Sequence, residues 1–359
     1  MRLTHMIALL FCCLGSLLAQ TASPPLGEIH TDPEDSKAGV RVALRPTGNV
    51  TASPEAVKIL GELEAANGLD PQPQTPWHVQ LTYDEFDDDG DNVHSGTIEE
   101  FYVTAKKYRT EIKTDDFHQI EIADGTNVYR SGDQGWPPRA AAQALQEVVS
   151  PIPGSNGNQD GSADKLDWKV GGAKLSCVVL RNGRILSDNG LPKFCYEPGT
   201  TVLRYKREPA GWNEAVFNSI LQFDQRFIAR DIEVTRGKPY LKIHVGKVEP
   251  LPSVDGALFS PSEGNVPLSG VLTVPSAVLM REYQFPREGF PQFPRGVKGK
   301  VTVKFTVNEE GKVVSAEAID GPEELRKAAE QDVRKLRFRP FLILDKPYMV
   351  QSTAVYNIQ

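Results

Sequence analysis

The sequence lacks an excess of positive charge, and it lacks a long apolar run beyond its first twenty residues. It carries 40 Lys and Arg against 47 Asp and Glu, for a formal net charge of -7. Because binding to phosphate groups is driven by clustered Lys and Arg, we expect no nucleic-acid partner. No later stretch is long and apolar enough to span a bilayer. A content of 40% hydrophobic and 24% charged residues is typical of a soluble globular protein.

Recognisable catalytic and metal-binding motifs are also missing. There is no G-x-S-x-G element, no P-loop and no dinucleotide-binding fingerprint. An acidic segment that begins at Glu85 resembles a calcium loop, but its twelfth position is Gly96 where an EF-hand needs Glu. The histidines of the mature chain are scattered, with no metal-ligand spacing: His30, His78, His94, His118 and His244. We therefore predict no metal, no cofactor and no enzymatic activity, and a hydrolase without a sequence signature is the least favoured alternative.

The N-terminus has the pattern of an export signal. Arg2 supplies a short positive start, and Ile7 to Ala19 is an unbroken run of apolar or small residues. This run has the length of a signal-peptide core and is shorter than a membrane span of about 20 residues. The pattern predicts a signal peptide over residues 1–19 and a periplasmic location. The alternative is an uncleaved anchor that holds the protein in the inner membrane through residues 7–19.

Removal of the signal would leave Cys177 and Cys195 as the last pair of cysteines. An even pair in an exported protein favours a disulfide bond. The two cysteines flank a predicted hairpin, with turn signals at 182–183 and 188–190 between them. A metal site is the alternative, but no histidine with suitable spacing accompanies the pair.

Residues 20–52 are rich in Pro, Gly and acidic residues and are predicted to be a flexible linker. A helix should follow, because Ser53 can cap it, Pro54 suits its first turn, and apolar residues recur every three or four positions up to Ala66. A second helix is expected over residues 139–149, and residues 151–165 read as a loop. Many short strands with a period of two surround these helices: 77–83, 96–103, 107–113, 119–123, 126–129, 166–170, 175–180, 193–196, 202–205, 227–235 and 240–248.

This layout, together with the segment Cys195 to Thr200, resembles the LolA/LolB-like half-barrel over residues 53–250. The resemblance implies a curved antiparallel sheet that wraps a helix and can hold a lipid or an acyl chain. The alternative is an antiparallel β domain whose interior is filled by side chains. A Pro-, Gly- and Ser-rich segment, residues 251–280, is predicted to be the linker to a second domain.

The C-terminal residues 281–359 have the clearest pattern. Val301, Val303, Phe305 and Val307 alternate with polar residues, which predicts a strand with one buried face. A turn and a second strand over 313–319 follow. A capped helix should then begin near Asp320 and end at Pro340, before a last strand over 349–358. The chain is thus predicted to be α+β, with a curved antiparallel sheet domain followed by a small ββαβ domain.

The segments Gly299 to Val307, Gly311 and Leu336 to Pro340 resemble the C-terminal domain of the TonB family over residues 286–359. Leu336 takes the place of the Trp that is usual in the family. The resemblance implies that the last strand is an exposed edge that receives an extended segment of an outer-membrane transporter or another envelope protein. The candidate binding residues are Val350, Gln351, Ser352, Thr353, Ala354 and Val355. The alternative is that this strand is covered by the rest of the protein or by a second copy in a homodimer.

Two functions follow from these resemblances. The preferred one is a periplasmic TonB-like protein that binds envelope proteins by β-strand addition, with energy transduction for transmembrane transport if the anchor is retained. The alternative is a periplasmic carrier of lipid or lipoprotein that docks through its TonB-like module.

The export signal makes a direct prediction. After expression in a Gram-negative host, mass spectrometry of the soluble periplasmic fraction should find a mature N-terminus at Gln20 or Ser23, because small residues precede both positions. An intact Met1 in the inner-membrane fraction would contradict cleavage and support the anchored alternative.

Overall fold

The computed structural model describes residues 27–29, 53–69, 75–152, 162–181, 192–208, 213–251, 255–284, 293–294 and 296–358. The predicted signal peptide, nearly all of the predicted linker over residues 20–52, and the turns at 182–183 and 188–190 lie outside these residues. None of the described helices is long and apolar enough to cross a membrane.

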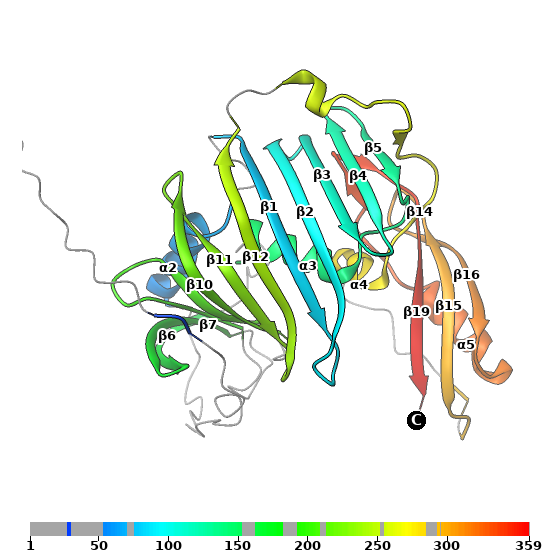
Figure 1. The fold of residues 1–359 in the computed structure, drawn as a ribbon. Helices are drawn as coiled ribbons and strands as arrows, with labels where there is room; N and C mark the ends of the chain where they lie inside the picture. Colours follow the sequence, from blue (N-terminus) through cyan, green and yellow to red (C-terminus); the bar gives the residue numbers. More distant parts are fainter. Residues whose placement is uncertain are drawn as a thin grey trace, which may run out of the picture.

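The largest structural unit of the described chain is one curved antiparallel sheet of thirteen strands (Figure 1). Its spatial order is β13-β5-β4-β3-β2-β1-β12-β11-β10-β9-β8-β7-β6, so that β1 and β12 meet in the middle. The strands are β1 Trp77–Phe86, β2 Asn92–Thr104, β3 Lys107–Thr114, β4 His118–Asp124, β5 Val128–Gly132, β6 Ser162–Val170, β7 Ala173–Arg181, β8 Lys193–Tyr196, β9 Leu203–Arg207, β10 Glu214–Phe223, β11 Arg226–Thr235, β12 Pro239–Pro250 and β13 Val266–Pro267.

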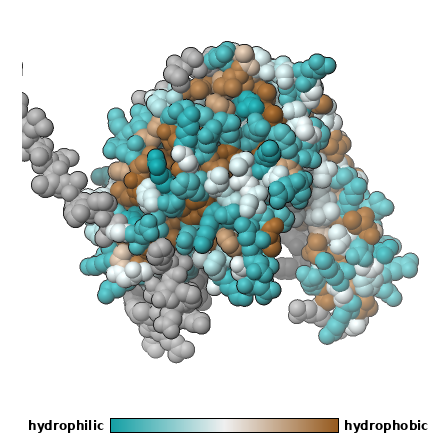
Figure 2. Space-filling view, viewed as in Figure 1, coloured by the Kyte–Doolittle hydropathy of each residue, from teal (hydrophilic) through white to brown (hydrophobic). Residues whose placement is uncertain are grey.

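Two helices pack against one face of this sheet. Helix α2 (Pro54–Ala66) begins as predicted, with the Ser53 Oγ accepting a hydrogen bond from the Ala56 N–H at 3.3 Å. Helix α3 (Arg139–Val149) presents small buried residues, Ala140, Ala141 and Ala144, which allow its close approach to the strands. Both helices share one hydrophobic core with the sheet. Hydrophilic side chains cover much of the opposite face over β1 and β2 (Figure 2), in keeping with alternating strands.

The predicted disulfide is confirmed. Cys177 and Cys195 occupy directly paired positions on β7 and β8, and their sulfur atoms are bonded at 2.06 Å.

The predicted strand pattern missed β10, because Asn218 and Ser219 interrupt its apolar residues and Ser219 adopts a positive φ of 52°. The prediction of a loop up to residue 165 was wrong at its end, since β6 begins at Ser162.

The C-terminal residues form a separate four-stranded sheet with the order β14-β19-β15-β16. Helix α5 covers one face of it, and the buried residues of β15 and α5 make a second core. A short hairpin, made of the two-residue strands β17 and β18, is inserted between α5 and β19. The elements are β14 Leu272–Thr273, β15 Gly299–Val307, β16 Val313–Asp320, α5 Glu323–Val333, β17 Leu342–Ile343, β18 Lys346–Pro347 and β19 Val350–Ile358.

Helix α5 is shorter than predicted, and its expected side-chain cap is absent. Its N-cap residue is Pro322, with no capping side chain, while the Asp320 carboxylate accepts a hydrogen bond from the adjacent Gly321 N–H. The helix ends at Val333 rather than near Pro340. Residues beyond it pair with other segments instead, because the Phe338 side chain is buried and its N–H donates to the Gly311 carbonyl at 2.9 Å. Burial of Phe338 therefore outweighs continuation of the helix.

The segment between the two sheets is paired to both of them. It contains η4 Gly256–Phe259, α4 Ser276–Leu279 and η5 Met280–Glu282. Strand β13 pairs with β5 at the edge of the large sheet, and β14 runs parallel to β19 in the small one. Each domain therefore gains one short strand from the same connecting segment.

Helix α3 is tied to the large sheet by a fully buried ion pair. The Lys206 Nζ lies 2.7 Å from a carboxylate oxygen of Glu147, and both side chains are 1% exposed. Lys206 also donates to the Pro151 carbonyl at 3.1 Å. Buried charges are tolerated only when they are paired in this way.

This pair gives a prediction for stability. Glu147→Ala should lower the free energy of unfolding by about 3–5 kcal/mol, because it leaves the buried Lys206 charge with only the more distant Glu208 carboxylate, at 3.7 Å. The double variant Glu147→Leu/Lys206→Met should recover most of the loss, since both charges are then removed together. Urea unfolding followed by circular dichroism measures both. Equal losses in the single and double variants would contradict the account.

Candidate functional site

The predicted binding residues Val350 to Val355 all lie on β19, and the structure divides them into two parts. Strand β15 pairs with the whole of β19 on one side. On the other side, β14 covers only the start: the Leu272 and Val274 N–H groups donate to the carbonyls of Met349 and Gln351 at 3.0 and 2.9 Å. The Ser352 Oγ donates to the Val274 carbonyl at 2.7 Å. The first half of the predicted binding residues, 350–352, is thus already covered by β14 and Val274.

The remainder of β19 has an open edge. The Gln351 carbonyl points toward β14, and backbone direction alternates along a strand, so the N–H and C=O groups of Thr353, Val355 and Asn357 face the same way. Within the described part of the chain, no strand pairs with them. Their side chains are exposed, with Val355 51% exposed. The prediction did not include Asn357, because a resemblance alone could not show where β14 stops.

The surroundings of this edge combine an aromatic pair with positive charge. The Tyr356 hydroxyl donates to the Asp332 carboxylate at 2.7 Å, and the Phe293 ring lies 5.6 Å from the Tyr356 ring. On the opposite face, Lys304 and Lys300 of β15 are register partners of Thr353 and Asn357. An incoming strand would therefore lie beside Tyr356 on one face and beside Thr353 and Asn357 on the other, with the two lysines one strand further away.

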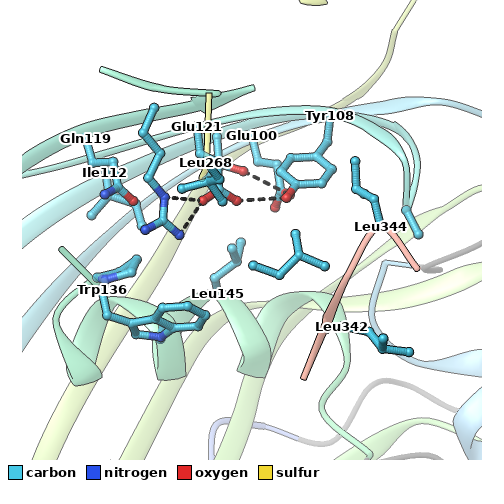
Figure 3. A pocket seen from close by; sticks show the side chains of 16 residues that line it. Glu100, Tyr108, Ile112, Gln119, Glu121, Trp136, Leu145, Leu268, Leu342 and Leu344 are labelled. Atoms are coloured by element: carbon cyan, nitrogen blue, oxygen red, sulfur yellow. Dashed lines mark hydrogen bonds and ion pairs between the residues drawn. The ribbon is translucent and has the colours of Figure 1, made fainter. Parts of the chain in front are cut away.

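A cavity of about 420 Å³ lies between the inner face of the large sheet, helix α3 and the β17–β18 hairpin (Figure 3). Its volume falls within the range of small-molecule sites, about 300–1,000 Å³. Residues of both domains line it: Glu100, Ala105, Tyr108, Thr110, Ile112, Gln119, Glu121, Arg130, Trp136, Pro137, Ala142, Leu145, Leu268, Leu342, Ile343 and Leu344.

The polar side of this cavity contains a closed network around Glu121. The Arg130 Nε donates to its carboxylate at 2.7 Å, and the Tyr108 hydroxyl donates at 2.8 Å. Arg130 also donates to the Gly135 carbonyl at 3.1 Å and stacks its guanidinium over Trp136. The charges of Glu121 and Arg130 thus neutralise each other, and the network needs no ligand to be satisfied.

Glu100 lies beside this network, but it forms no ion pair with a described residue. Its side chain is buried and accepts one hydrogen bond, from the Thr110 hydroxyl at 3.2 Å. Burial raises the pKa of Glu100 to about 8, and the negative charge of Glu121 adds to the effect. At neutral pH Glu100 is therefore mostly a carboxylic acid, which can donate a hydrogen bond into the cavity. Nothing in the sequence singled it out, because its position depends on the pairing of four strands.

The C-terminal domain closes one side of the cavity with the β17–β18 hairpin. Its turn residues Leu344 and Asp345 both have positive φ, 50° and 64°. Asp345 forms an ion pair with Lys106, and the Lys346 Nζ donates to the Asn127 Oδ1 at 2.8 Å. These contacts hold the hairpin against the large sheet.

Within the described residues, no group of three or more His, Cys, Asp or Glu side chains is arranged to hold a metal ion, and this includes the histidines and the acidic turn. His78 lies between Glu99 and Glu249, at 2.7 and 3.0 Å. In the acidic turn, one Asp87 carboxylate oxygen accepts three backbone N–H groups of the turn itself. The turn is thus a local, self-satisfied structure.

The shifted pKa of Glu100 predicts how stability depends on pH. Above the ordinary carboxyl pKa of 4.5 the unfolded chain releases a proton that the folded protein retains, so stability falls as pH rises toward about 8. Glu100→Gln removes this penalty. The difference in the free energy of unfolding between Glu100→Gln and the unmodified protein should therefore grow, in favour of the variant, by about 1.4 kcal/mol for each pH unit in that window. Exposed Glu317→Gln is the control, and parallel pH profiles for Glu100→Gln and the unmodified protein would overturn the assignment.

Comparison with known families agrees with the TonB resemblance of the C-terminal residues. Residues 294–358 match the family described as Gram-negative bacterial TonB protein C-terminal. No curated protein matches the sequence.

Similar solved structures include a LolA superfamily protein from Nitrosomonas europaea, with 7% identity and a TM-score of 0.37 over 57% of this chain and 97% of that one. A DUF1329 family protein from Desulfovibrio piger has 7% identity and a TM-score of 0.38 over 57% and 96%. MucB has 10% identity and a TM-score of 0.33 over 80% and 99%. At these scores the structural likenesses say nothing about ligand or partner, whereas the C-terminal segment is TonB-like.

Proposed function

We propose that this protein binds an extended segment of another envelope protein by adding it as a strand to the open edge of β19. The observation that carries the proposal is the edge itself: the outward backbone groups of Thr353, Val355 and Asn357 have no partner strand among the described residues. The TonB-like match of residues 294–358 supports an envelope partner, such as an outer-membrane transporter.

The structure of the edge restricts how a partner strand can bind. Strand β14 occupies the pairing positions of Val350 and Gln351, so an incoming strand can pair only with the later residues of β19. Main-chain hydrogen bonds would supply affinity, and side chains of the added strand would supply selectivity. On the outer face Lys300 and Lys304 lie one strand beyond β19, within reach of long side chains of the added strand, which favours a segment with acidic residues.

The role is therefore binding rather than catalysis. Whether force is also transmitted depends on the N-terminus, because a pull from the inner membrane requires that residues 7–19 remain as an anchor. Release of the signal would make the protein a periplasmic adaptor. In both cases the same edge would hold the partner.

Substitution at Val355 tests the edge. Val355→Pro removes the outward N–H donor without touching the bonds to β15, because proline is tolerated on strand edges. It should weaken binding of synthetic peptides from the periplasm-facing segments of outer-membrane transporters by about tenfold or more, as measured by fluorescence anisotropy with the full chain. Val355→Thr keeps the N–H and is the matched control, expected to bind like the unmodified protein.

Equal binding by Val355→Pro and Val355→Thr would contradict the proposal. A second copy of the chain is the competing occupant of this edge. If a homodimer used it, sedimentation of the unmodified protein would show a dimer that Val355→Pro converts to a monomer, and no peptide would bind.

The carrier function remains a second candidate, and one observation favours it. The cavity between the two domains has the volume of a ligand site, and much of its lining is apolar, including Leu145 and Leu342. A lipid or acyl chain is the chemistry that suits such a lining.

A further inference from the structure

The lining of the cavity between the domains is divided by chemistry. Strands β2 to β5 of the large sheet supply its polar groups, whereas α3 and the β17–β18 hairpin supply aliphatic side chains (Figure 3). Glu100 and Glu121 lie on one side of the space, and Leu145, Leu342 and Leu344 lie on the other. Ile112 and Leu268 add aliphatic groups beside the polar ones, so the cavity suits a molecule with one polar end and an apolar chain.

The polar groups also determine the charge of that end. Glu121 and Arg130 neutralise each other, and Tyr108 donates its hydroxyl hydrogen to Glu121. The Gln119 side-chain amide donates to the Asp133 and Gly135 carbonyls. These contacts thus leave the proton of the Glu100 carboxyl group as a donor for a ligand. It suits a neutral acceptor, because a ligand carboxylate would face Glu121 without an unpaired cation.

The hairpin of the C-terminal domain completes the apolar side at a conformational cost. Two-residue turns with positive φ favour Asn or Gly, yet this turn begins with Leu344 at a φ of 50°. A leucine in this conformation is strained, and such strain is found where the side chain serves a function. Here the Leu344 side chain reaches the cavity, while Asp345 and Lys346 hold the hairpin to Lys106 and Asn127.

We propose that this cavity binds the ester end of an acyl chain, with the Glu100 carboxyl group donating a hydrogen bond to the ester carbonyl and Leu342 and Leu344 of the TonB-like domain covering the chain. The inference rests on the carrier function as second candidate and adds the chemistry of its ligand. It also makes the TonB-like domain part of the ligand site.

The role of Glu100 makes binding depend on pH. The titratable and charged groups that face it are Tyr108, Glu121 and Arg130 from β3, β4 and β5; α3 and the hairpin contribute only aliphatic side chains to the cavity. The pKa of Tyr108 is raised well above its ordinary value, so Tyr108 stays neutral. Above about pH 8 Glu100 loses its proton and becomes a carboxylate that repels the ester carbonyl. Affinity should therefore fall as pH rises through that value.

The test uses methyl dodecanoate to displace the neutral fluorescent probe N-phenyl-1-naphthylamine from the full chain. Between about pH 6.5 and about pH 9 the affinity for methyl dodecanoate should fall about tenfold, because binding requires the protonated Glu100. Glu100→Gln keeps a neutral donor and should bind with equal affinity at both pH values. Dodecanoic acid should bind more weakly than its methyl ester at either pH.

A second pair of variants tests the hairpin. Leu344→Asn suits the positive φ of the turn but removes the aliphatic cover, so its affinity for methyl dodecanoate should fall several-fold at both pH values. Val314→Asn replaces an exposed valine of the same domain that does not line the cavity, and it should bind like the unmodified protein.

Outcomes separate the inference from the function on which it rests. Displacement that is equal at both pH values, or unchanged by Leu344→Asn, would overturn the inference and leave a carrier with a non-selective cavity. No displacement by methyl dodecanoate or by the acid would overturn both. Binding of peptides to β19 is independent of either result.

Discussion

The need to pair the backbone groups of every strand determines which surface of this molecule is left for a partner. A strand edge exposes a row of donors and acceptors, and folded proteins normally cover it. Here a single connecting segment does so in both domains: β13 pairs with β5 at one edge of the large sheet, and β14 pairs with the start of β19. The part of β19 beyond Ser352 is what this segment leaves uncovered.

The same connection places the two domains so that they share a cavity. Strand β14 fixes the small sheet beside the large one, and the β17–β18 hairpin then reaches the inner face of β3 and β4 (Figure 1). Glu121, Arg130 and Tyr108 are paired with one another in that space, whereas Glu100 accepts a hydrogen bond from Thr110. Burial of a carboxyl group costs stability, which is consistent with a functional reason for keeping it.

Local patterns in the sequence were sufficient to predict the elements that depend on nearby residues. Ser53 and Pro54 marked the start of α2, the alternation from Val301 to Val307 marked β15, and the cysteine pair marked β7 and β8. The predictions failed where distant contacts decide the structure. The apolar pattern of β10 is interrupted by Asn218, whose side chain binds the backbone of Ile29. Helix α5 ends early because Phe338 is buried between other segments.

The candidate site was predicted only in part for the same reason. The resemblance pointed to the correct strand, but the cover by Leu272 and Thr273 comes from a pairing far away in sequence. Glu100 became a candidate only once its burial and the network around Glu121 were known. Turn chemistry would have predicted Asn or Gly where Leu344 stands, so a departure from the local rule marked a residue of interest.

Amide hydrogen exchange at Thr353, Val355 and Asn357, followed by NMR of the full chain with and without a transporter peptide, tests the central claim most directly. The account predicts rapid exchange in the free protein, because no strand among the described residues pairs with these N–H groups, and strong protection once the peptide is added. Slow exchange in the free protein, or exchange that the bound peptide leaves unchanged, would contradict an open edge as the binding site.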